Sequence, residues 1–401
     1  MRPADFNRSA LLVCAALAVL AGCGAQSQTA TMAPPGTTIV PQGRVIRYSV
    51  SALTTPLGGG VAEGISNRDW VVGSTNGQSG CCRERAALWR DGEFTDLGTL
   101  GGRNSSEQWP VKDDRGLIAI VAETSKRDPL QENFCGFGTA LTCLGALWED
   151  GVLRALPTLG GNNGSAFAVN DLGQVAGYAE TSKKDSSCPT PHVLDFQGVV
   201  WGPNRGETHQ LRHLAGDTVG GADGINDRQQ VIGVSGICSN PSRHGVLWYH
   251  GTITDLGNLG GVLNTFPWAI NSRGDVVGQS DLPGDTTNDA FLWTKAKGMQ
   301  NLGTLPGDGA SLAFGTNSRL QIVGGSCIDV SYNNCRAFLW QDGTMVDMND
   351  LVCSATSLHL FFGNDINDRG TIVGYAFDKS THKYRPFIAV PRIVASRSKT
   401  C

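Results

Sequence analysis

The sequence predicts an all-β fold assembled from seven copies of one unit, on three observations. A short apolar segment ending in tryptophan recurs at spacings of 59, 53, 47, 45 and 47 residues, at Trp89, Trp148, Trp201, Trp248, Trp293 and Trp340. A segment of the type Ile-Asn-Asp-x-Gly-x-Val-Val-Gly precedes each of them, and one like Leu-Gly-Thr-Leu-Gly-Gly follows. Glycine supplies 53 of the 401 residues, which is typical of a chain rich in turns.

Each unit is predicted to hold four antiparallel strands, a to d. In Ile366–Gly374 the Asn and Asp side chains can hold a tight turn and glycine supplies a positive φ, so this segment predicts the a–b hairpin. Asp342-Gly343 between two apolar runs predicts the c–d hairpin. A degraded copy at Val111–Gly116 brings the a–b hairpins to seven. The recurrent asparagines are expected to cap these turns rather than to form a ring of ligands: Asn67, Asn170, Asn226, Asn271, Asn317 and Asn367.

The two ends of the repeat region predict that the units close into a ring. Val45–Val50 resembles a d strand with no c strand before it, and Tyr384–Val390 resembles a c strand with no d strand after it. Pairing these ends completes a seventh unit and removes both exposed edges. We therefore predict a seven-bladed β-propeller over residues 45–391, followed by a tail at 392–401. An open solenoid, or a ring of six or eight blades, is the alternative.

The first 44 residues indicate that the protein is located outside the cytoplasm. Residues 1–22 combine two arginines with an apolar run that is too short to span a bilayer, as in a signal peptide. Leu20-Ala21-Gly22-Cys23 resembles the bacterial lipoprotein box, so Cys23 is the predicted lipidation site and 23–44 the tether. By resemblance to enterobacterial lipoproteins, Gly24 favours the outer membrane, on its periplasmic or surface side. An ordinary signal peptide containing Cys23 is the alternative.

Cysteine usage agrees with an oxidising compartment. Without Cys14 of the leader and Cys23, ten of the twelve cysteines remain, an even number. Cys135 with Cys143, and Cys327 with Cys335, are each eight residues apart at matching places in their repeats, so we predict two local disulfides. The partners of the other six stay open. We expect no metal and no cofactor, because there is no Cys-x-x-Cys pair and strand residues His209 and His213 would stand ~13 Å apart.

The repeats resemble a bacterial extracellular repeat family, the HAF repeat, which is named for its His-Ala-Phe motif. The resemblance covers about residues 45–391 and rests on three recurring segments, Ala-Phe-Leu-Trp, Asp-Leu-Gly-Thr-Leu-Gly-Gly and Ile-Asn-x-x-Gly-x-Val-Val-Gly. The resemblance implies a secreted or surface β-propeller-like protein with no established biochemical activity. Only His244 keeps the family histidine, so no histidine-based function is expected. The corresponding positions hold Arg85, Leu144, Gln197, Asp289, Arg336 and Arg385.

Charge and motifs exclude several function classes. A formal net charge of −4 gives no basic excess for a nucleic-acid partner. Gly-x-Ser-x-Gly, His-Glu-x-x-His and EF-hand patterns do not occur, so no catalytic residue is predicted. The glycine-rich d–a segments precede strands and lack the Gly-Lys-Ser/Thr ending of a phosphate loop, which indicates crossovers. The repeated tryptophans are expected to pack in the core or between blades rather than to stack on sugars.

Topology places the candidate binding residues on one face. In a blade of four antiparallel strands, the b–c and d–a connections share a face, and the a–b and c–d turns share the other. The long b–c insertions 124–143, 181–197 and 326–335 lie on the first face, where binding is usually found. The polar candidates of its d–a loops are Arg103, Asn104, Asn163, Asp217, Asn264 and Asp308.

These observations lead to one hypothesis with two competitors. We expect a monomeric, lipid-anchored propeller that binds a protein or a glycan through its b–c/d–a face. The first competitor is a polysaccharide-active enzyme, a hydrolase or lyase, whose paired carboxylates would converge near the ring axis, ~5 to 10 Å apart. The second is a structural scaffold of the envelope without a specific ligand.

Overall fold

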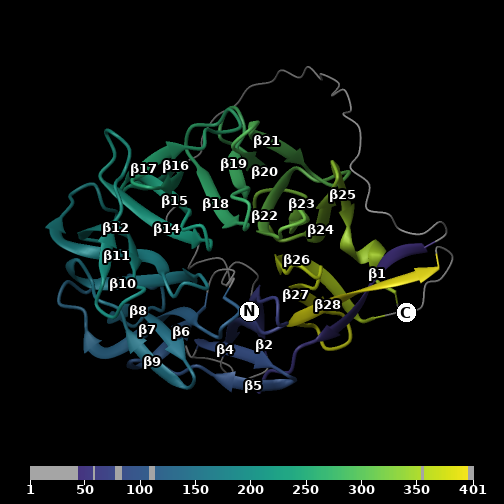
Figure 1. The fold of residues 1–401 in the computed structure, drawn as a ribbon, viewed down its shortest axis with the longest axis horizontal. Coiled ribbons are helices and arrows are strands. Elements are labelled where there is room, and N and C mark those ends of the chain that lie inside the picture. The colour runs from purple at the N-terminus through teal and green to yellow at the C-terminus, as the bar shows by residue number, and fades with distance from the viewer. Residues whose placement is uncertain (1–43, 57–58, 77–83, 108–112, 354–355, 396–401) are drawn as a thin grey trace.

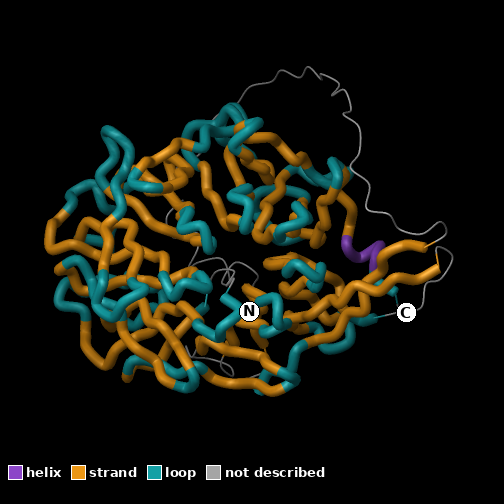
Figure 2. The backbone as a smooth tube through the Cα atoms, in the orientation of Figure 1, coloured by secondary structure: helices purple, strands orange, loops and turns teal. Residues whose placement is uncertain are grey.

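Seven four-stranded antiparallel sheets form a ring in the computed structural model, which describes residues 44–56, 59–76, 84–107, 113–353 and 356–395. The sheets surround one axis as the blades of a propeller (Figure 1), which confirms the predicted fold and blade number. Strands and loops make up almost all of the described chain (Figure 2), and a 3₁₀-helix, η2, spans Met348–Leu351. Cys23 and the predicted leader and tether up to residue 43 lie outside these residues.

Six blades follow the chain in order, each with strand a nearest the axis. Blade 1 has β2 (Gly59–Ile65), β3 (Val71–Asn76), β4 (Glu84–Arg90) and β5 (Glu93–Asp96). Blade 2 has β6 (Gly101–Ser106), β7 (Ile118–Arg127), β8 (Leu141–Glu149) and β9 (Val152–Ala155). Blade 3 has β10 (Gly160–Val169), β11 (Val175–Lys184), β12 (Leu194–Trp201) and β13 (Thr208–Gln210). Blade 4 has β14 (Val219–Ile225), β15 (Val231–Ile237), β16 (Asn240–Tyr249) and β17 (Thr252–Asp255). Blade 5 has β18 (Thr265–Ile270), β19 (Val276–Asp281), β20 (Asn288–Thr294) and β21 (Gly298–Gly303). Blade 6 has β22 (Ala310–Thr316), β23 (Ile322–Cys327), β24 (Cys335–Gln341) and β25 (Thr344–Asp347).

The seventh blade joins the two ends of the described chain. Its strands are β26 (Leu358–Ile366), β27 (Ile372–Asp378), β28 (Lys383–Ala395) and, on the outside, β1 (Arg44–Ala52). β1 and β28 pair antiparallel from Arg44↔Ala395 to Ala52↔Phe387. The predicted closure is therefore confirmed, with β28 continuing four residues beyond the predicted boundary at 391.

A β-bulge interrupts the innermost strand of six blades. In blade 4, Ala222 pairs with Gly233 and Gly224 with Ile232, so Asp223 has no partner in the ladder. The corresponding bulged residues of the other five blades are Glu63, Phe167, Trp268, Phe314 and Asn364. A bulge re-aims the side chain of its extra residue. Each of these six innermost strands thereby presents one residue at the same level of the ring.

The repeated glycine of Val-Val-Gly makes room for this bulge. A Cβ on Gly233 would lie 2.0 Å from the carbonyl oxygen of Gly221 on the neighbouring strand. The same clash, at 1.9 to 2.1 Å, exists at Gly73, Gly177, Gly278, Gly324 and Gly374. Blade 2 has Ile120 at this position, and its inner strand β6 ends at Ser106. The glycine is therefore absent from the blade in which the described residues form no such bulge.

The recurrent tryptophans join successive blades, as predicted. The indole N–H of Trp89 donates to the carbonyl oxygen of Thr54 at 2.7 Å, and that of Trp201 to Pro157 at 2.9 Å. Each acceptor lies in the crossover that leads from the preceding blade. Because the ring is buried and its polar N–H is satisfied, the tryptophan fills the interface between blades without a desolvation penalty.

Three disulfides lie within the described residues. The two predicted pairs, Cys135–Cys143 and Cys327–Cys335, are confirmed. The third joins Cys188 in the b–c loop of blade 3 to Cys238 in blade 4, 50 residues away. Cys353 is also disulfide-bonded, whereas Cys81, Cys82 and Cys401 lie outside the described residues.

No helix within the described ranges is long and apolar enough to cross a membrane.

Candidate functional site

A ring of asparagines connects the a–b turns around the axis. The Oδ1 of Asn226 accepts the backbone N–H groups of Arg228 and Gln230, both at 3.0 Å, which caps the turn as predicted. Its Nδ2 donates to the carbonyl oxygen of Asn271 in the next blade at 2.9 Å. The same bond to the following blade is made by Asn170, Asn271, Asn317 and Asn367. The asparagines thus cap turns and also fasten the blades to one another.

One residue of the predicted set does not belong to this ring. The register shows that Ser66, not Asn67, occupies the asparagine position of blade 1, because the backbone of Ser66 accepts the bond from Asn367. Asn67 lies one place later, where its Oδ1 accepts the N–H of Asp368 and its own N–H donates to Asp114. The predicted turn-capping position is therefore one residue too late in blade 1, because this blade has Ile-Ser-Asn in place of Ile-Asn-Asp.

Blade 2 has an acid in the ring position. Oδ1 of Asp113 accepts the N–H groups of Arg115, Gly116 and Leu117 at 2.6 to 2.8 Å, as an asparagine would. Its Oδ2 stands where the asparagines carry the donating Nδ2, and this buried oxygen has no hydrogen-bond partner among the described residues. Burial raises the pKa of Asp113, and the nearby Asp171 carboxylate raises it further. Neither Ser66 nor Asp113 makes the inter-blade bond of the asparagines within the described structure.

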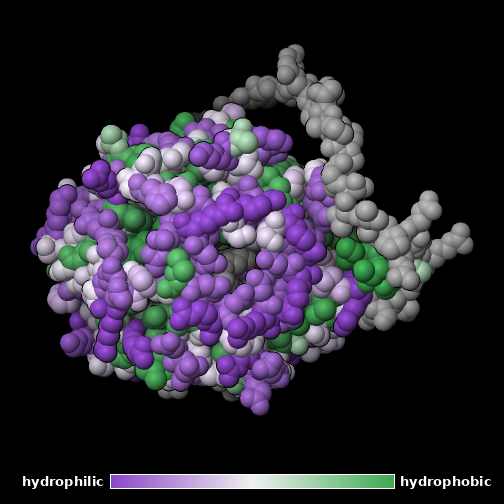
Figure 3. All heavy atoms as spheres, viewed as in Figure 1, coloured by the Kyte–Doolittle hydropathy of each residue, from purple (hydrophilic) through white to green (hydrophobic). Residues whose placement is uncertain are grey.

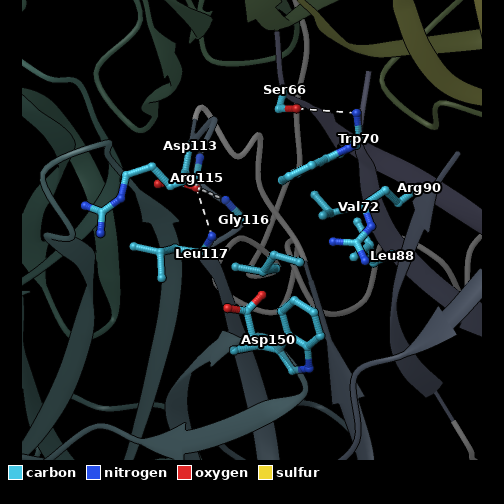
Figure 4. A pocket seen from close by; sticks show the side chains of 12 residues that line it. Ser66, Trp70, Val72, Leu88, Arg90, Asp113, Arg115, Gly116, Leu117 and Asp150 are labelled. Atoms are coloured by element: carbon cyan, nitrogen blue, oxygen red, sulfur yellow. Dashed lines mark hydrogen bonds between the residues drawn. The ribbon is translucent and has the colours of Figure 1, made fainter. Parts of the chain in front are cut away.

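A pocket opens where these two exceptions meet. It lies between blades 1 and 2 on the a–b/c–d face, encloses about 440 Å³ including its open mouth, and is lined by Ser66 and Asp113. Its remaining walls include Trp70, Arg90 and Asp150. Figure 4 shows Trp70 and Asp150 on opposite sides of the opening, with Asp113 beside it. Sequence reasoning did not identify this pocket, because neither Ser66 nor Asp113 departs from turn chemistry.

The six bulged residues form a second group of interest, closer to the middle of the ring. They lie on the innermost strands β2, β10, β14, β18, β22 and β26, around the axis (Figure 1), and the face in view is hollowed at that axis (Figure 3). We call these residues the axial ring. Its members come from six different blades, so only the closed fold brings them together.

One arc of the axial ring is aromatic. The ring centroids of Trp268 and Phe314 are 5.1 Å apart, and those of Phe314 and Phe362 are 5.5 Å apart, each pair spanning two blades. Phe266 lies 4.5 Å from Trp268 on the same strand. Trp268 and Phe314 are partly exposed. The arc combines tilted and edge-on rings that other flat apolar groups can join.

Acids lie in the blades on either side of this arc, Glu63 in blade 1 and Asp223 in blade 4. Nδ2 of Asn364 donates to Oε2 of Glu63 at 2.7 Å across the joint between blades 7 and 1. Burial raises the pKa of Glu63 to about 8, with a further contribution from the Glu84 carboxylate. Burial also raises the pKa of Glu84, whose carboxylate accepts a bond from Ser106. The Glu63 carboxyl group is therefore largely protonated at neutral pH.

Asp223 is the least compensated acid of the axial ring. It is 3% exposed, its Oδ2 has no hydrogen-bond partner in the described part of the chain, and burial alone raises its pKa well above the ordinary value. Leaving a buried polar atom unpaired costs about 1–3 kcal/mol. Tyr178 is the neighbouring hydroxyl, and burial together with the Asp223 charge raises its pKa. The ring of Tyr178 contacts Phe167, at 5.3 Å between centroids.

The predicted loop candidates lie on the b–c/d–a face. Two of them, Asn104 and Asn163, join their own blade to the preceding blade by hydrogen bonds. Asn104 donates to Glu123 at 2.9 Å and accepts the N–H of Glu84 in blade 1 at 3.0 Å. Asn163 makes the same bonds one blade later, to Glu180 at 3.1 Å and from Cys143 at 3.0 Å. Both side chains are buried, whereas Arg103 is exposed.

The other three candidates also have partners within the fold. Asp217 accepts a hydrogen bond from Ser235 at 2.7 Å. Asp308 accepts one from Ser326 at 2.7 Å and pairs with Arg336 at 2.8 Å. Asn264 bonds Ser242 at 2.7 Å and Asp281 at 3.1 Å. Ligand binding through these six residues stays a prediction, and the bonds show that five of them already brace the d–a crossovers.

The long b–c loops reach from this face toward the axial ring. Phe134, in the loop of blade 2, lies 5.3 Å from Tyr178 between ring centroids. Glu132 of the same loop accepts the N–H of Leu194 at 3.1 Å and so ties it to blade 3. No group of histidine, cysteine, aspartate and glutamate suited to a metal occurs within the described part of the chain.

Comparison with known proteins gives distant structural likeness. No protein-family model matches the chain, and no curated protein matches it. The extracellular domain assigned to a one-component system of B. thetaiotaomicron has 8% sequence identity and a TM-score of 0.48, over 85% of this chain and 39% of that one. TolB from Acinetobacter baumannii has 12% identity and a TM-score of 0.39, over 88% and 66%. A protein of unknown function from Dyadobacter fermentans has 10% identity and a TM-score of 0.42, over 88% and 100%. This chain spans about two fifths of the length of the first of these structures.

Proposed function

We propose that this protein is a non-catalytic, glycan-binding propeller of the bacterial cell envelope, held at the outer membrane by a lipid on Cys23 and related to the HAF-repeat proteins. The observation that carries the binding function is the axial ring, in which an aromatic arc on blades 5 to 7 is flanked by carboxyl groups of blades 1 and 4. The leader, the lipoprotein box and the disulfides support the location.

The chemistry of the axial ring suits a sugar chain. Aromatic faces such as those of Trp268 and Phe314 pack against the C–H face of a pyranose, and carboxyl groups exchange hydrogen bonds with its hydroxyls. Oδ2 of Asp223 has no partner among the residues that the structure describes, and a ligand hydroxyl would satisfy it. An uncharged ligand also fits, because the pKa of Glu63 is raised to about 8 and burial raises the pKa of Asp223 as well.

The same pKa directions favour binding over hydrolysis. A glycosidase needs one protonated and one ionised carboxyl group across the scissile bond. Burial raises the pKa of Glu63, Glu84 and Asp223 alike, which favours the protonated form of all three and favours none of them as the ionised partner. The polysaccharide-active enzyme remains the competing function because Glu63, with its pKa near 8, could serve as a general acid.

Calorimetric titration tests the binding function. The soluble domain, residues 44–401, is titrated with hexasaccharides of glucose, N-acetylglucosamine and galacturonate. Trp268→Ala and Asp223→Asn are each expected to weaken binding at least tenfold, while Leu172→Ala, at an exposed side chain of the a–b face, leaves it unchanged. Absence of binding to every glycan, or equal affinity in Trp268→Ala, contradicts the proposal. Release of shorter sugars that stops in Glu63→Gln would establish the enzyme instead.

The lipid anchor has its own test. Full-length protein and Cys23→Ser are expressed with a labelled fatty acid and the membranes are fractionated. We expect label and outer-membrane recovery for the natural chain, and loss of both in Cys23→Ser. Label without Cys23, or a soluble periplasmic natural chain, would overturn the anchoring.

A further inference from the structure

We propose that the b–c loop of blade 2, residues 128–140, is held on blade 3 by a proton shared between the carboxyl groups of Glu132 and Glu180, and that the loop detaches when this proton is lost. The loop connects β7 to β8 on the b–c/d–a face, whereas Glu180 lies on β11 of the next blade (Figure 1). The proposal does not depend on glycan binding, because it concerns contacts between two blades of the protein itself.

The loop is held together by bonds of its own. Oδ1 of Asp128 accepts the backbone N–H of Glu132 at 3.2 Å. The backbone N–H of Asp128 donates to the carbonyl oxygen of Ala140 at 3.0 Å, which closes the base of the loop. The Cys135–Cys143 disulfide fixes the middle of the loop to β8. We therefore expect the loop to keep these internal bonds when its contacts with blade 3 are lost.

The polar contacts of the loop with blade 3 are made by two of its acids. Oε1 of Glu132 accepts the backbone N–H groups of Val193 and Leu194, the second at 3.1 Å. Oδ2 of Asp128 accepts the Nδ2–H of Asn163 at 2.8 Å. Attachment of the loop therefore requires acidic side chains to be buried in the interface between the two blades, where their charges are poorly solvated.

Glu132 and Glu180 form a pair of buried carboxyl groups. Oε2 of Glu180 accepts the N–H groups of Asn162 and Asn163 and the Nδ2–H of Asn163. Oε1 of Glu180 and Oε2 of Glu132 have no donor among the described residues, although both side chains are fully buried. Glu180 is the side-chain hydrogen-bond partner of Glu132. Because an ionised carboxylate can only accept, this bond requires a proton on one of the two groups.

Blade 2 contains the same arrangement with a hydroxyl in place of the second acid. One carboxylate oxygen of Glu123, on β7, accepts the N–H groups of Arg103 and Asn104 and the Nδ2–H of Asn104, as Glu180 does in its own blade. The other oxygen accepts the hydroxyl of Thr139. The repeated glutamate therefore takes a donor on its second oxygen, and a protonated Glu132 supplies the corresponding donor in blade 3.

The pair is expected to hold its proton at neutral pH. Burial, together with the charge of Glu132, raises the pKa of Glu180 to about 8. Burial also raises the pKa of Glu132, and the Asp128 carboxylate raises it further. No described cation shifts the pKa of either group. The folded state therefore binds a proton that the unfolded chain releases above the ordinary pKa of 4.5, and the attachment it supports is lost as the pH rises through about 8.

The other titratable groups near the pair carry no compensating charge. Tyr178 lies on β11, and burial together with the Asp223 and Glu180 charges raises its pKa. His192 precedes the residues that bond Glu132, and burial lowers its pKa, which favours the neutral ring. Ionisation of both glutamates would therefore place two carboxylates against each other without a cation to balance them.

Detachment of the loop would change the surroundings of the axial ring. Phe134 of the loop lies 5.3 Å from Tyr178 and 6.1 Å from His192 between ring centroids. Tyr178 in turn neighbours Phe167, a member of the axial ring, at 5.3 Å. Withdrawal of Phe134 would expose the Tyr178 ring on the b–c/d–a face. Loss of one proton would thus open one side of the axial ring.

Pulsed hydrogen exchange of the full chain, read by mass spectrometry, tests the proposal between pH 6 and 9.5 with EDTA present. The protection of segment 190–196, which contains the N–H groups that donate to Glu132, is corrected for the intrinsic exchange rate at each pH. We expect this protection to fall at least tenfold with a midpoint near pH 8. Segment 102–106, which donates to Glu123 in blade 2, is the internal reference and should stay protected.

Two isosteric variants replace the shared proton by an amide. In Glu132→Gln the new amide can donate to Glu180 at every pH, and in Glu180→Gln it can donate to Glu132, so each variant should keep segment 190–196 protected up to pH 9.5. Glu63→Gln is the matched control, because it removes another buried acid with a pKa of about 8 and should leave the transition in place.

Four results would overturn the proposal. These are constant protection of segment 190–196 in the natural chain, an equal loss in both glutamine variants, a parallel loss in segment 102–106, and disappearance of the transition in Glu63→Gln. Addition of Ca²⁺ without EDTA completes the test at pH 9.5. Unchanged low protection supports the shared proton, whereas restored protection would assign the two free oxygens to a cation instead.

Discussion

The glycine that ends each Val-Val-Gly segment determines where an inner strand can bulge. At Gly233 the neighbouring carbonyl of Gly221 occupies the place of a Cβ, so no other residue fits without moving the backbone. The bulge beside it brings Asp223 into the axial ring. Gly233, which has no side chain, therefore determines where the side chain of Asp223 lies on the neighbouring strand.

We expect Gly233→Ala to lower the free energy of unfolding by at least about 2–3 kcal/mol, because a Cβ at 2.0 Å from a backbone oxygen forces the two strands apart. Gly198→Ala is the matched control, since its Cβ would meet ordinary contacts at 3.5 Å. Urea unfolding of both variants measures the difference. Equal stability of the two variants would show that the bulge relaxes freely.

Stability should fall with rising pH through the titration of Glu63. Its pKa is about 8 in the folded protein, above the ordinary value of 4.5, so the folded state binds more protons between these values. The contribution is complete below pH ~4.5 and is lost as the pH rises through 8. Unfolding midpoints from pH 5 to 9 measure this loss. Glu63→Gln should flatten the profile, and an unchanged slope in that variant would assign the dependence to other groups.

At the scale of the element, the d–a crossovers use two versions of one brace. Blades 2 and 3 pair an asparagine of the crossover with a glutamate on strand b, as in Asn163 with Glu180. Blades 4 and 6 pair an aspartate with a serine, as in Asp217 with Ser235. The polar residues of these loops therefore form hydrogen bonds largely with other residues of the fold.

The disulfide between blades 3 and 4 should contribute more stability than the hairpin disulfide of blade 6. Loop-closure entropy predicts about 4 kcal/mol for Cys188–Cys238 with 50 residues enclosed, against about 2.5 kcal/mol for Cys327–Cys335 with eight. Double replacement of each pair by alanine, followed by urea unfolding, compares them. A larger loss for the blade 6 pair would show that native-state effects dominate over chain entropy.

The sequence predicts strands, turns and ring closure because each depends on residues close in the chain. The Asp-Gly turns have the expected positive φ at both residues, 54° and 82° at Asp91-Gly92. The axial ring and the blade 1–2 pocket could not be predicted in this way. A bulge depends on the pairing register of two strands. The pocket depends on Ser66 and Asp113 coming together at the interface between blades 1 and 2.

At the scale of the whole molecule, closure of the ring depends on one strand from the N-terminal end. β1 covers the outer edge of β28 over nine residue pairs, and without it this edge would offer unpaired backbone groups to other chains. The hydrogen bonds of the asparagine ring close the same circuit nearer the axis, from Asn367 to Ser66. The β1–β28 pairing therefore closes the ring at its outer edge, and the bond from Asn367 to Ser66 closes it near the axis.

Deletion of residues 44–52 is expected to lower the unfolding temperature and to produce oligomers through the exposed β28 edge. Size-exclusion chromatography and thermal unfolding measure both effects. Deletion of residues 1–43 is the control, because it keeps every described strand, and a synthetic peptide of residues 44–52 should restore the monomer. A stable monomer without β1 would mean that the inner asparagine bonds suffice for closure.

The pairing of Arg44 with Ala395 also determines how the domain can be presented to its surroundings. Both ends of the described chain leave at one point on the rim, on the side of the c–d turns, where the seventh blade has two ends in place of a turn. A domain suspended from that point keeps the opposite side, with its b–c loops, turned outward and unobstructed. The blade 1–2 pocket, on the suspended side, would then face the support.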